Sequence, residues 1–286
     1  MLKIIFFFTI VMNSSCTKND KKIQINSPSG NIKVVVENNQ EITYLVEFNK
    51  QIVVRKSLLG MLFKDGNTLF NDPVITNITE ENINDIWELP WGEVKKIQNN
   101  YREKTITISD SESGMITELI FRAYNDGIAF RYNVKSNGHE NDKMIISDGL
   151  TQFNLTNNAR LWWTPAYGDN RYEELYQKSA MSEMDTSHTP LTIKYPDGIH
   201  LSIHEADLVD YSSMQLFHSI DNNLNCDLAE WNNGDKVRVI LPFQTPWRTI
   251  KIANSAKELI TSYLTLNCNQ PSKIKDVSWI KPSKYI

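Results

Sequence analysis

The 286-residue sequence is poor in cysteine and has no excess of basic residues. Three cysteines are too few for the disulfide framework that holds small secreted domains together. Lysine and arginine number 30 against 34 acidic residues. The sequence has no basic stripe of the kind that binds nucleic acids, so we expect no nucleic-acid partner. Hydrophobic residues make up 41% of the chain, which is enough for a packed core and excludes wholesale disorder.

Long apolar runs are also scarce, and the clearest one lies at the N-terminus. Residues 4–12 would rise only about 14 Å as a helix, which is too short to span a bilayer but typical of a signal peptide. Small polar residues then precede Cys16, as in a bacterial lipoprotein signal. We expect residues 1–16 to be a signal peptide, residues 17–26 to be a polar linker, and Cys16 to be lipidated. The protein would then be exported to the periplasm or anchored at the outer membrane by its lipid alone, and an ordinary cleaved signal is the alternative.

Most of the remaining chain alternates between apolar and polar residues with a period of two, which is typical of strands. The runs that we expect to be strands are residues 31–37, 42–48, 101–108, 115–123, 128–134, 191–195, 199–205, 237–243 and 247–253. Asp-Gly pairs at 126–127 and 197–198 favour hairpins between their flanking runs. The pattern predicts an all-β fold, a single large antiparallel β-sandwich over residues 27–286.

Helix signals are few. Residues 172–181 are expected to form a short helix, and Ser255 is placed to cap another over residues 256–263. The polar segment 71–100 is expected to be a long connection.

Cys226 and Cys268 are expected to be buried thiols, because free cysteine packs as a small apolar residue; a disulfide between them is the alternative in an exported protein.

Glu205 is the acidic residue with the most informative position. Strand alternation puts it on the same face as Ile199 and Ile203, which is the apolar side. Burying an unpaired carboxylate costs several kcal/mol, so the pattern alone favours a solvated Glu205 at the sheet rim, with contact to a cation as the alternative. Asp207 and Asp210 are nearby acids that we interpret as loop caps.

Other reactive side chains give weaker signals. His200 and His204 share one strand face with Ser202, so a metal pair is conceivable, but a polar sheet face is the simpler interpretation. Glu173 and Glu174 are adjacent acids, whereas glycoside hydrolysis needs two facing carboxylates roughly 5–9 Å apart. Tryptophans able to stack on sugars or to fill a core occur at positions 87, 91, 162, 163 and 247.

Several strings of the sequence together resemble the N-terminal domain of glycoside hydrolase family 97. They are SPSGNIK at residues 27–33, FRAYNDGIAFRY at 121–132, TPLTIKYPDGIHLSIHEADLVDYSSM at 189–214, PFQTPWRTIKIANSAKEL at 242–259 and LNCNQPSKIKDVSWIKPSKY at 266–285. Their order and spacing cover nearly the whole chain after the signal segment. The resemblance implies a β-super-sandwich like the galactose mutarotase domains, followed in the family by a catalytic (β/α)₈ barrel.

The resemblance also implies site residues. Family members are α-glucosidases or α-galactosidases with a calcium ion in the active site, and one glutamate ligand comes from the N-terminal domain, at a position that matches Glu205. Asn170, Tyr172 and Glu173 lie in a loop that in the family points toward the barrel, which makes them candidates for contact with substrate or calcium.

The resemblance therefore predicts part of an enzyme. The chain stops at Ile286, where the family continues into its barrel, so we expect no catalytic residues here. The expected role is to supply a calcium ligand and one wall of the active site to a separate barrel, which acts on α-linked oligosaccharides. We also expect an exposed apolar patch where the barrel would dock. The alternative is a free-standing exported module that binds carbohydrate or another protein.

Overall fold

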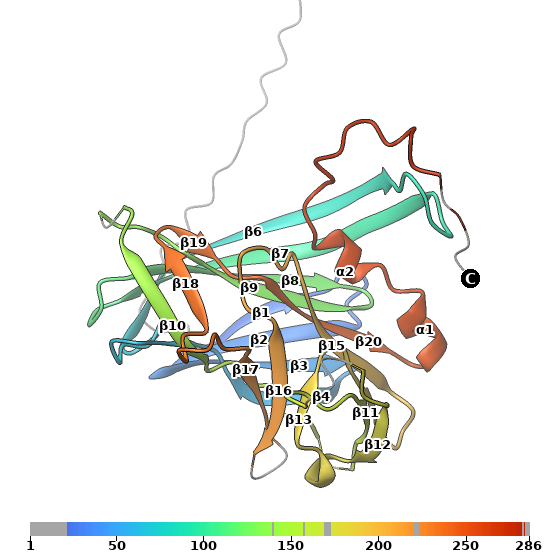
Figure 1. Ribbon diagram of the computed structural model, residues 1–286, viewed down its shortest axis with the longest axis horizontal. Helices are drawn as coiled ribbons and strands as arrows, with labels where there is room; N and C mark the ends of the chain where they lie inside the picture. The colour runs from blue at the N-terminus through green and yellow to red at the C-terminus, as the bar shows by residue number, and fades with distance from the viewer. Residues whose placement is uncertain are drawn as a thin grey trace, which may run out of the picture.

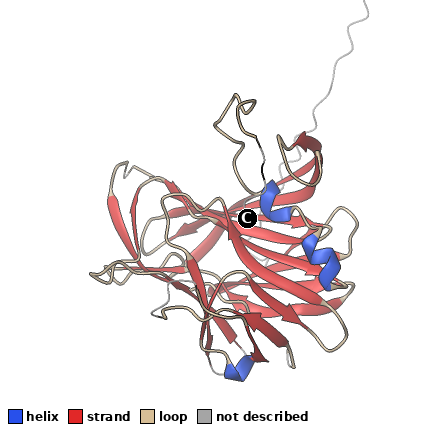
Figure 2. Cartoon of the chain, turned by 45° about the vertical axis from the view of Figure 1, so that its right-hand side comes forward, coloured by secondary structure: helices blue, strands red, loops and turns tan. Residues whose placement is uncertain are grey.

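The computed structural model describes residues 22–138, 140–156, 158–168, 173–219, 223–281 and 283. Within these ranges the strands form four antiparallel sheets, and only short helices lie at the periphery (Figures 1 and 2). The predicted all-β antiparallel architecture is confirmed. None of the helices in these ranges is long and apolar enough to cross a bilayer.

The core lies between a small sheet and a large one. The small sheet runs in the order β1 (Lys22–Asn26), β2 (Ile32–Asn39), β3 (Glu41–Phe48) and β4 (Gln51–Leu58). Tyr44 of β3 packs on two rings of the large sheet, with centroids 5.9 Å from Phe121 and 5.2 Å from Phe130. All three side chains are buried. Alternating apolar residues on facing strands thus build a sandwich core.

The large sheet contains ten strands. Its main order is β12 (Gln177–Ala180), β11 (Arg160–Trp163), β14 (Leu191–Lys194), β15 (His200–Ala206), β20 (Trp247–Ala253), β9 (Gly127–Val134), β8 (Ile116–Tyr124), β7 (Lys96–Asp110) and β6 (Pro73–Glu88). The short strand β19 (Phe243–Gln244) pairs with the far end of β9. Both Asp-Gly hairpins occur as predicted, between β8 and β9 and between β14 and β15.

Two three-stranded sheets and three short helices complete the described part of the fold. One sheet has the order β18 (Val237–Ile240), β10 (Lys143–Gly149) and β5 (Met61–Phe63), and the other β13 (Thr186–His188), β16 (Met214–Ser219) and β17 (Asn223–Leu228). The helices are the 3₁₀ turn η1 (Met181–Glu183), α1 (Ala256–Ile260) and α2 (Leu264–Asn267). Ser255 caps α1 as predicted, by accepting a hydrogen bond from the Glu258 N–H, but that helix ends at Ile260.

The helix expected over residues 172–181 is wrong where the structure describes it. Residues 177–180 form β12, which pairs with β11 at the edge of the large sheet. The Trp163 indole N–H donates to the buried Ser179 hydroxyl at 3.0 Å, so cross-strand contacts outweigh the helical propensity of this segment. Residues 173–176 form no regular structure, and Tyr172 lies outside the described residues.

Two further segments differ from expectation. The segment 71–100 is no long connection, because β6 and the first residues of β7 pair in a long hairpin. Most of β6 is exposed or half-buried, whereas Ile97 of β7 is buried. Residues 22–26, expected to end a polar linker, form β1, because Ile23 and Ile25 are buried in the core. The expected signal peptide, the rest of the linker and Cys16 lie outside the described residues.

The prediction for the two later cysteines is confirmed. Cys226 and Cys268 are both free and buried.

Candidate functional site

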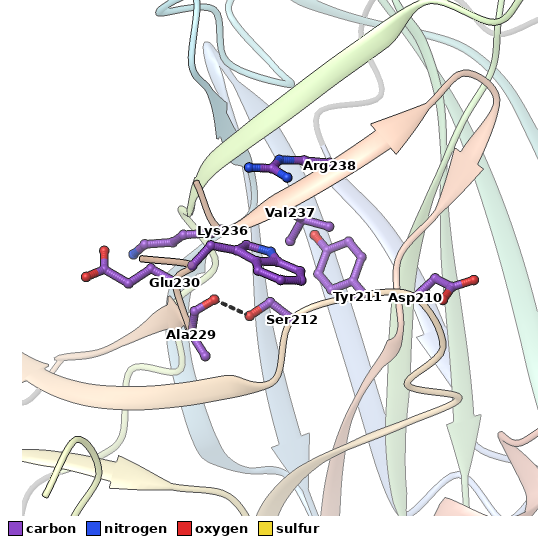
Figure 3. A pocket seen from close by; sticks show the side chains of 9 residues that line it. Asp210, Tyr211, Ser212, Ala229, Glu230, Lys236, Val237 and Arg238 are labelled. Carbon is purple, nitrogen blue, oxygen red and sulfur yellow. Dashed lines mark hydrogen bonds between the residues drawn. The ribbon is translucent and has the colours of Figure 1, made fainter. Parts of the chain in front are cut away.

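Two neighbouring cavities lie beside the sheet of β13, β16 and β17. The larger has a volume of about 620 Å³ and is lined by Asp210, Tyr211, Ser212, Ala229, Glu230, Trp231, Lys236, Val237 and Arg238 (Figure 3). The smaller has a volume of about 310 Å³ and is lined by Pro165, Tyr167, Gly168, Glu174, His188, Gln215, Ala229 and Glu230. Ala229 and Glu230 line both, so the two cavities adjoin.

Two loops supply most of the larger cavity. Residues 207–213 connect β15 to β16, and residues 229–236 connect β17 to β18. The Ser212 hydroxyl donates to the Ala229 carbonyl and ties the loops together (Figure 3). In the second loop, the Gly234 N–H donates to the Trp231 carbonyl at 2.8 Å, and the Trp231 N–H donates to the Asp235 carbonyl at 2.8 Å. This closed turn fixes the backbone of Trp231.

The basic residues of the larger cavity already have acidic partners. Lys236 forms ion pairs with Asp148 at 3.0 Å and with Asp227. Arg238 forms an ion pair with Asp235 at 3.0 Å. Hydrogen bonds from Lys64 and then from Arg238 lower the pKa of Asp235 to about 2.

Arg238 also lies over the Trp231 ring, 5.6 Å from its centroid. By contrast, Asp210 and Glu230 form no hydrogen bond or ion pair with the described residues. The cavity therefore combines fixed cations, an exposed indole and two acids with free acceptor atoms.

Tyr167 is the exposed aromatic residue of the smaller cavity. Its hydroxyl lies 2.6 Å from a carboxylate oxygen of Asp227 and 3.2 Å from the amide oxygen of Gln215. Burial of the hydroxyl and the hydrogen bond to Asp227 both raise the pKa of Tyr167 above its usual value. Burial lowers the pKa of His188, on the wall of the same cavity. Both shifts favour the neutral form of the side chain.

Glu205 lies outside both cavities. It is on the core side as predicted, 6% exposed, but the predicted solvated position at the sheet rim is wrong. One carboxylate oxygen accepts a hydrogen bond from the Met214 N–H at 3.0 Å, and the other pairs with the Arg248 guanidinium. Arg248 lies directly opposite on β20, a pairing that residue spacing in the sequence does not show.

The other candidates are spread over different parts of the fold. Asn170 and Tyr172 lie outside the described residues, whereas Glu173 immediately follows that segment and is exposed. Glu174 lines the smaller cavity. The His200 ring lies 2.7 Å from the Gly198 carbonyl, and the His204 ring lies 3.2 Å from the Thr189 hydroxyl. No cluster of three or more metal-binding side chains occurs among the residues that the structure describes.

The tryptophans divide into core and surface residues. Trp247 is buried, with Arg122 and Arg131 each 4.3 Å from its ring centroid. Trp231 was not singled out by the sequence pattern, although it is 61% exposed at the larger cavity. The sequence around Trp231 indicates its exposure, because a single Trp inside the polar turn sequence Glu-Trp-Asn-Asn-Gly has no strand face to pack against.

The model of the glycosyl-hydrolase 97 N-terminal domain matches residues 25–271. The chain belongs to glycosyl hydrolase family 97. The match covers the sandwich, both cavities and helices α1 and α2. The family resemblance of the sequence is thus confirmed.

Solved family 97 structures agree with this assignment. A family 97 enzyme from Pseudoalteromonas sp. strain K8, solved with panose, is 37% identical with a TM-score of 0.88, and the match covers 91% of this chain and 40% of that one. The same enzyme in complex with acarbose gives the same values. A retaining alpha-galactosidase from Bacteroides thetaiotaomicron is 22% identical over 314 residues, which is 99% of this chain and 46% of the relative. The chain thus spans less than half the length of these relatives.

The calcium ion that the family resemblance assigns to Glu205 does not fit this residue in the structure. Both oxygens of the Glu205 carboxylate already have partners within the fold. One of these partners is the Arg248 guanidinium, whose positive charge opposes a second cation at the same oxygen. Glu205 is therefore a structural acid that holds β15, β16 and β20 together.

Proposed function

We propose that this family 97 domain forms one wall of a glycosidase active site, opposite a catalytic barrel. The observation that carries the proposal is the family match over residues 25–271. The smaller cavity and the exposed Glu173 support a position for the proposed wall, because the lining residues Gly168 and Glu174 and Glu173 itself flank, in sequence, the loop from which substrate contacts were predicted. The barrel would supply the catalytic carboxylates, so we assign no catalytic residue to this chain and propose that it is inactive alone.

The proposed substrate is an α-linked oligosaccharide. The solved relative with 37% identity was crystallised with panose and with acarbose, and the relative with 22% identity is an alpha-galactosidase. The higher identity supports an α-glucoside over an α-galactoside. Asn170, Tyr172 and Glu173 remain the proposed contacts to substrate.

Calcium and export are further parts of the proposal. Since Glu205 is engaged in an ion pair, Glu173 is the better candidate for a calcium contact from this chain; it is exposed and makes no ion pair with the described residues. The barrel would have to complete such a site. The apolar run at residues 4–12 and Cys16 support export to the periplasm and lipid anchoring at the outer membrane.

Reconstitution tests this function. The purified chain, a family 97 barrel expressed separately, and a mixture of the two are assayed on p-nitrophenyl α-glucoside and α-galactoside with calcium. We expect turnover that is faster in the mixture than with the barrel alone, and none with the chain alone. Turnover by the chain alone, or a mixture no faster than the barrel, contradicts the proposal.

The second candidate function is a free-standing carbohydrate-binding or interaction module. The exposed aromatic residues Tyr167 and Trp231 at adjoining cavities favour it. The two functions differ in one measurable property, because only the first requires this chain to bind a barrel. Sedimentation of the mixture described above therefore separates them.

A further inference from the structure

We infer that the larger cavity is a saccharide-binding subsite, with the indole of Trp231 as its platform. It would take a neutral pyranose unit of an α-linked oligosaccharide, outside the segment proposed to face the catalytic barrel. The inference rests on the proposed function for the kind of sugar and for the direction from which that sugar would reach the cavity. The site itself follows from the side chains that line the cavity.

The first observation is the exposure of Trp231. The Trp231 ring lines the cavity and is 61% exposed, so a ligand can reach the part of it that Arg238, 5.6 Å from the ring centroid, leaves uncovered. The turn closed by Gly234 fixes the backbone of Trp231, so little conformational entropy of this loop is lost when a ligand binds. Indole rings stack on the C–H faces of pyranose rings, which are flat and weakly apolar.

The second observation is the distribution of charge. Lys236 and Arg238 are paired with acidic side chains, which offset their charge and disfavour an anionic ligand. Asp210 and Glu230 keep free acceptor atoms within the described structure, and Figure 3 shows them at opposite ends of the row of lining residues. Two separated acids are a poor cation site but suit sugar hydroxyls, which donate hydrogen bonds to carboxylates.

The third observation is the continuity of the two cavities. Glu230 lines both, with Trp231 on one side and Tyr167, 55% exposed, on the other. Glu174, next to the proposed substrate-contact segment, lines only the smaller cavity. An oligosaccharide that leaves the catalytic centre through the smaller cavity would therefore meet Trp231 further along.

Calorimetric titration of the full chain with panose and with maltotriose tests the inference. The variants are Trp231→Ala and, as the matched control, Trp279→Ala, which removes another exposed indole remote in sequence from the cavity (68% exposed). We expect the wild type to bind both sugars, Trp231→Ala to weaken binding on the order of tenfold, and Trp279→Ala to bind as the wild type does. Thermal unfolding checks that both variants remain folded.

Three results would overturn the subsite. They are no heat of binding for the wild type up to millimolar sugar, an unchanged affinity of a folded Trp231→Ala, or an equal loss in Trp279→Ala. Because this titration needs no barrel, its failure leaves the reconstitution assay unaffected. Binding at Trp231 without any activation of a barrel would in turn favour the module function and keep the subsite.

Discussion

The buried pair of Glu205 and Arg248 is the residue-scale feature that distinguishes a structural acid from a metal ligand. Both side chains are nearly inaccessible, at 5% and 7% exposure, and Glu205 also holds the Met214 N–H. The pair therefore fixes the start of β16 and closes the 207–213 loop that lines the larger cavity. Removing one partner leaves a buried charge uncompensated, which is the costly case for buried ion pairs.

We predict that Glu205→Ala destabilises the chain by about 3–5 kcal/mol, measured by urea unfolding. Replacing both residues by methionine should recover much of the loss, because the uncompensated charge is then gone. Glu88→Ala is the control, since its pair with Lys95 is exposed and worth about 0–1 kcal/mol. A Glu205→Ala variant with normal stability but lost calcium binding would instead support the ligand role.

His204 gives the protein a predictable response to acid. Burial lowers the pKa of His204, so the folded state prefers the neutral ring. The unfolded chain then binds more protons, and stability is full above the unfolded pKa of about 6.5 and is lost as the pH falls below it. We predict that His204→Gln flattens the fall in melting temperature between pH 7 and pH 5. The remaining slope comes partly from His188, whose pKa is also lowered. Parallel profiles for wild type and variant would contradict this assignment.

At the scale of elements, the β8–β9 hairpin depends on one glycine. A Cβ at Gly127 would lie 2.3 Å from the Ile250 carbonyl oxygen and 2.9 Å from the Lys251 Cα, so the neighbouring strand β20 would have to move. Gly198, in the β14–β15 hairpin, has a positive φ of 96° but open space around its Cβ position.

We predict that Gly127→Ala lowers stability by several kcal/mol, because the clash is with backbone and adds to the conformational strain. Gly198→Ala isolates the cost of strain alone and should lose on the order of 1 kcal/mol. Chemical denaturation of both variants gives the comparison. Equal losses of stability in the two variants would show that the close approach of β20 to Gly127 adds nothing to the cost of the substitution.

How far the sequence predicts an element depends on whether one face of it is buried. Strands β8 and β15 alternate between buried and half-buried residues over most of their length, and β9 does so in its second half, because one face meets the core; their ranges were predicted within one or two residues. In β6, the longest strand of the sheet, only Pro73 is buried and the other residues are exposed or half-buried, so no buried face imposes a period-two pattern there. Its hairpin end is instead held by α2, whose Asn267 accepts from the Trp87 indole and donates to the Gln98 carbonyl.

The same limit applies to the site. The sheet face on which Glu205 lies could be predicted from its position in a strand. Its pairing with Arg248, 43 residues away in sequence, could not, because it depends on the register between β15 and β20. The cavities depend on loops whose geometry no strand pattern encodes. Sequence therefore predicted the sandwich and the family, and tertiary contacts decided which acid is buried and which aromatic is exposed.

At the scale of the whole molecule, apolar side chains remain uncovered beside the larger cavity. Leu208 and Val209 are 43% and 68% exposed, in the loop that also supplies three residues of that cavity. The loop is anchored, since the Asp207 N–H donates to Asn269 at 2.8 Å. Leu266 of α2, three residues before that anchor, is a further exposed apolar side chain at 40%. If these side chains form one contiguous patch, they would mark a surface that binds another domain.

We predict that the isolated chain binds a hydrophobic dye and associates as its concentration rises, and that Val209→Asp reduces both. The reason is that a charge placed in an anchored apolar loop must be desolvated when two such surfaces meet. Ile52→Asp, at the edge of the small sheet, is the matched control at an exposed apolar position and should change neither property. Dye fluorescence and sedimentation velocity measure the two effects. If the loop docks a barrel, adding a family 97 barrel should remove the dye signal of the wild type, whereas a monomeric, dye-negative wild type would show that Leu208 and Val209 are ordinary exposed residues.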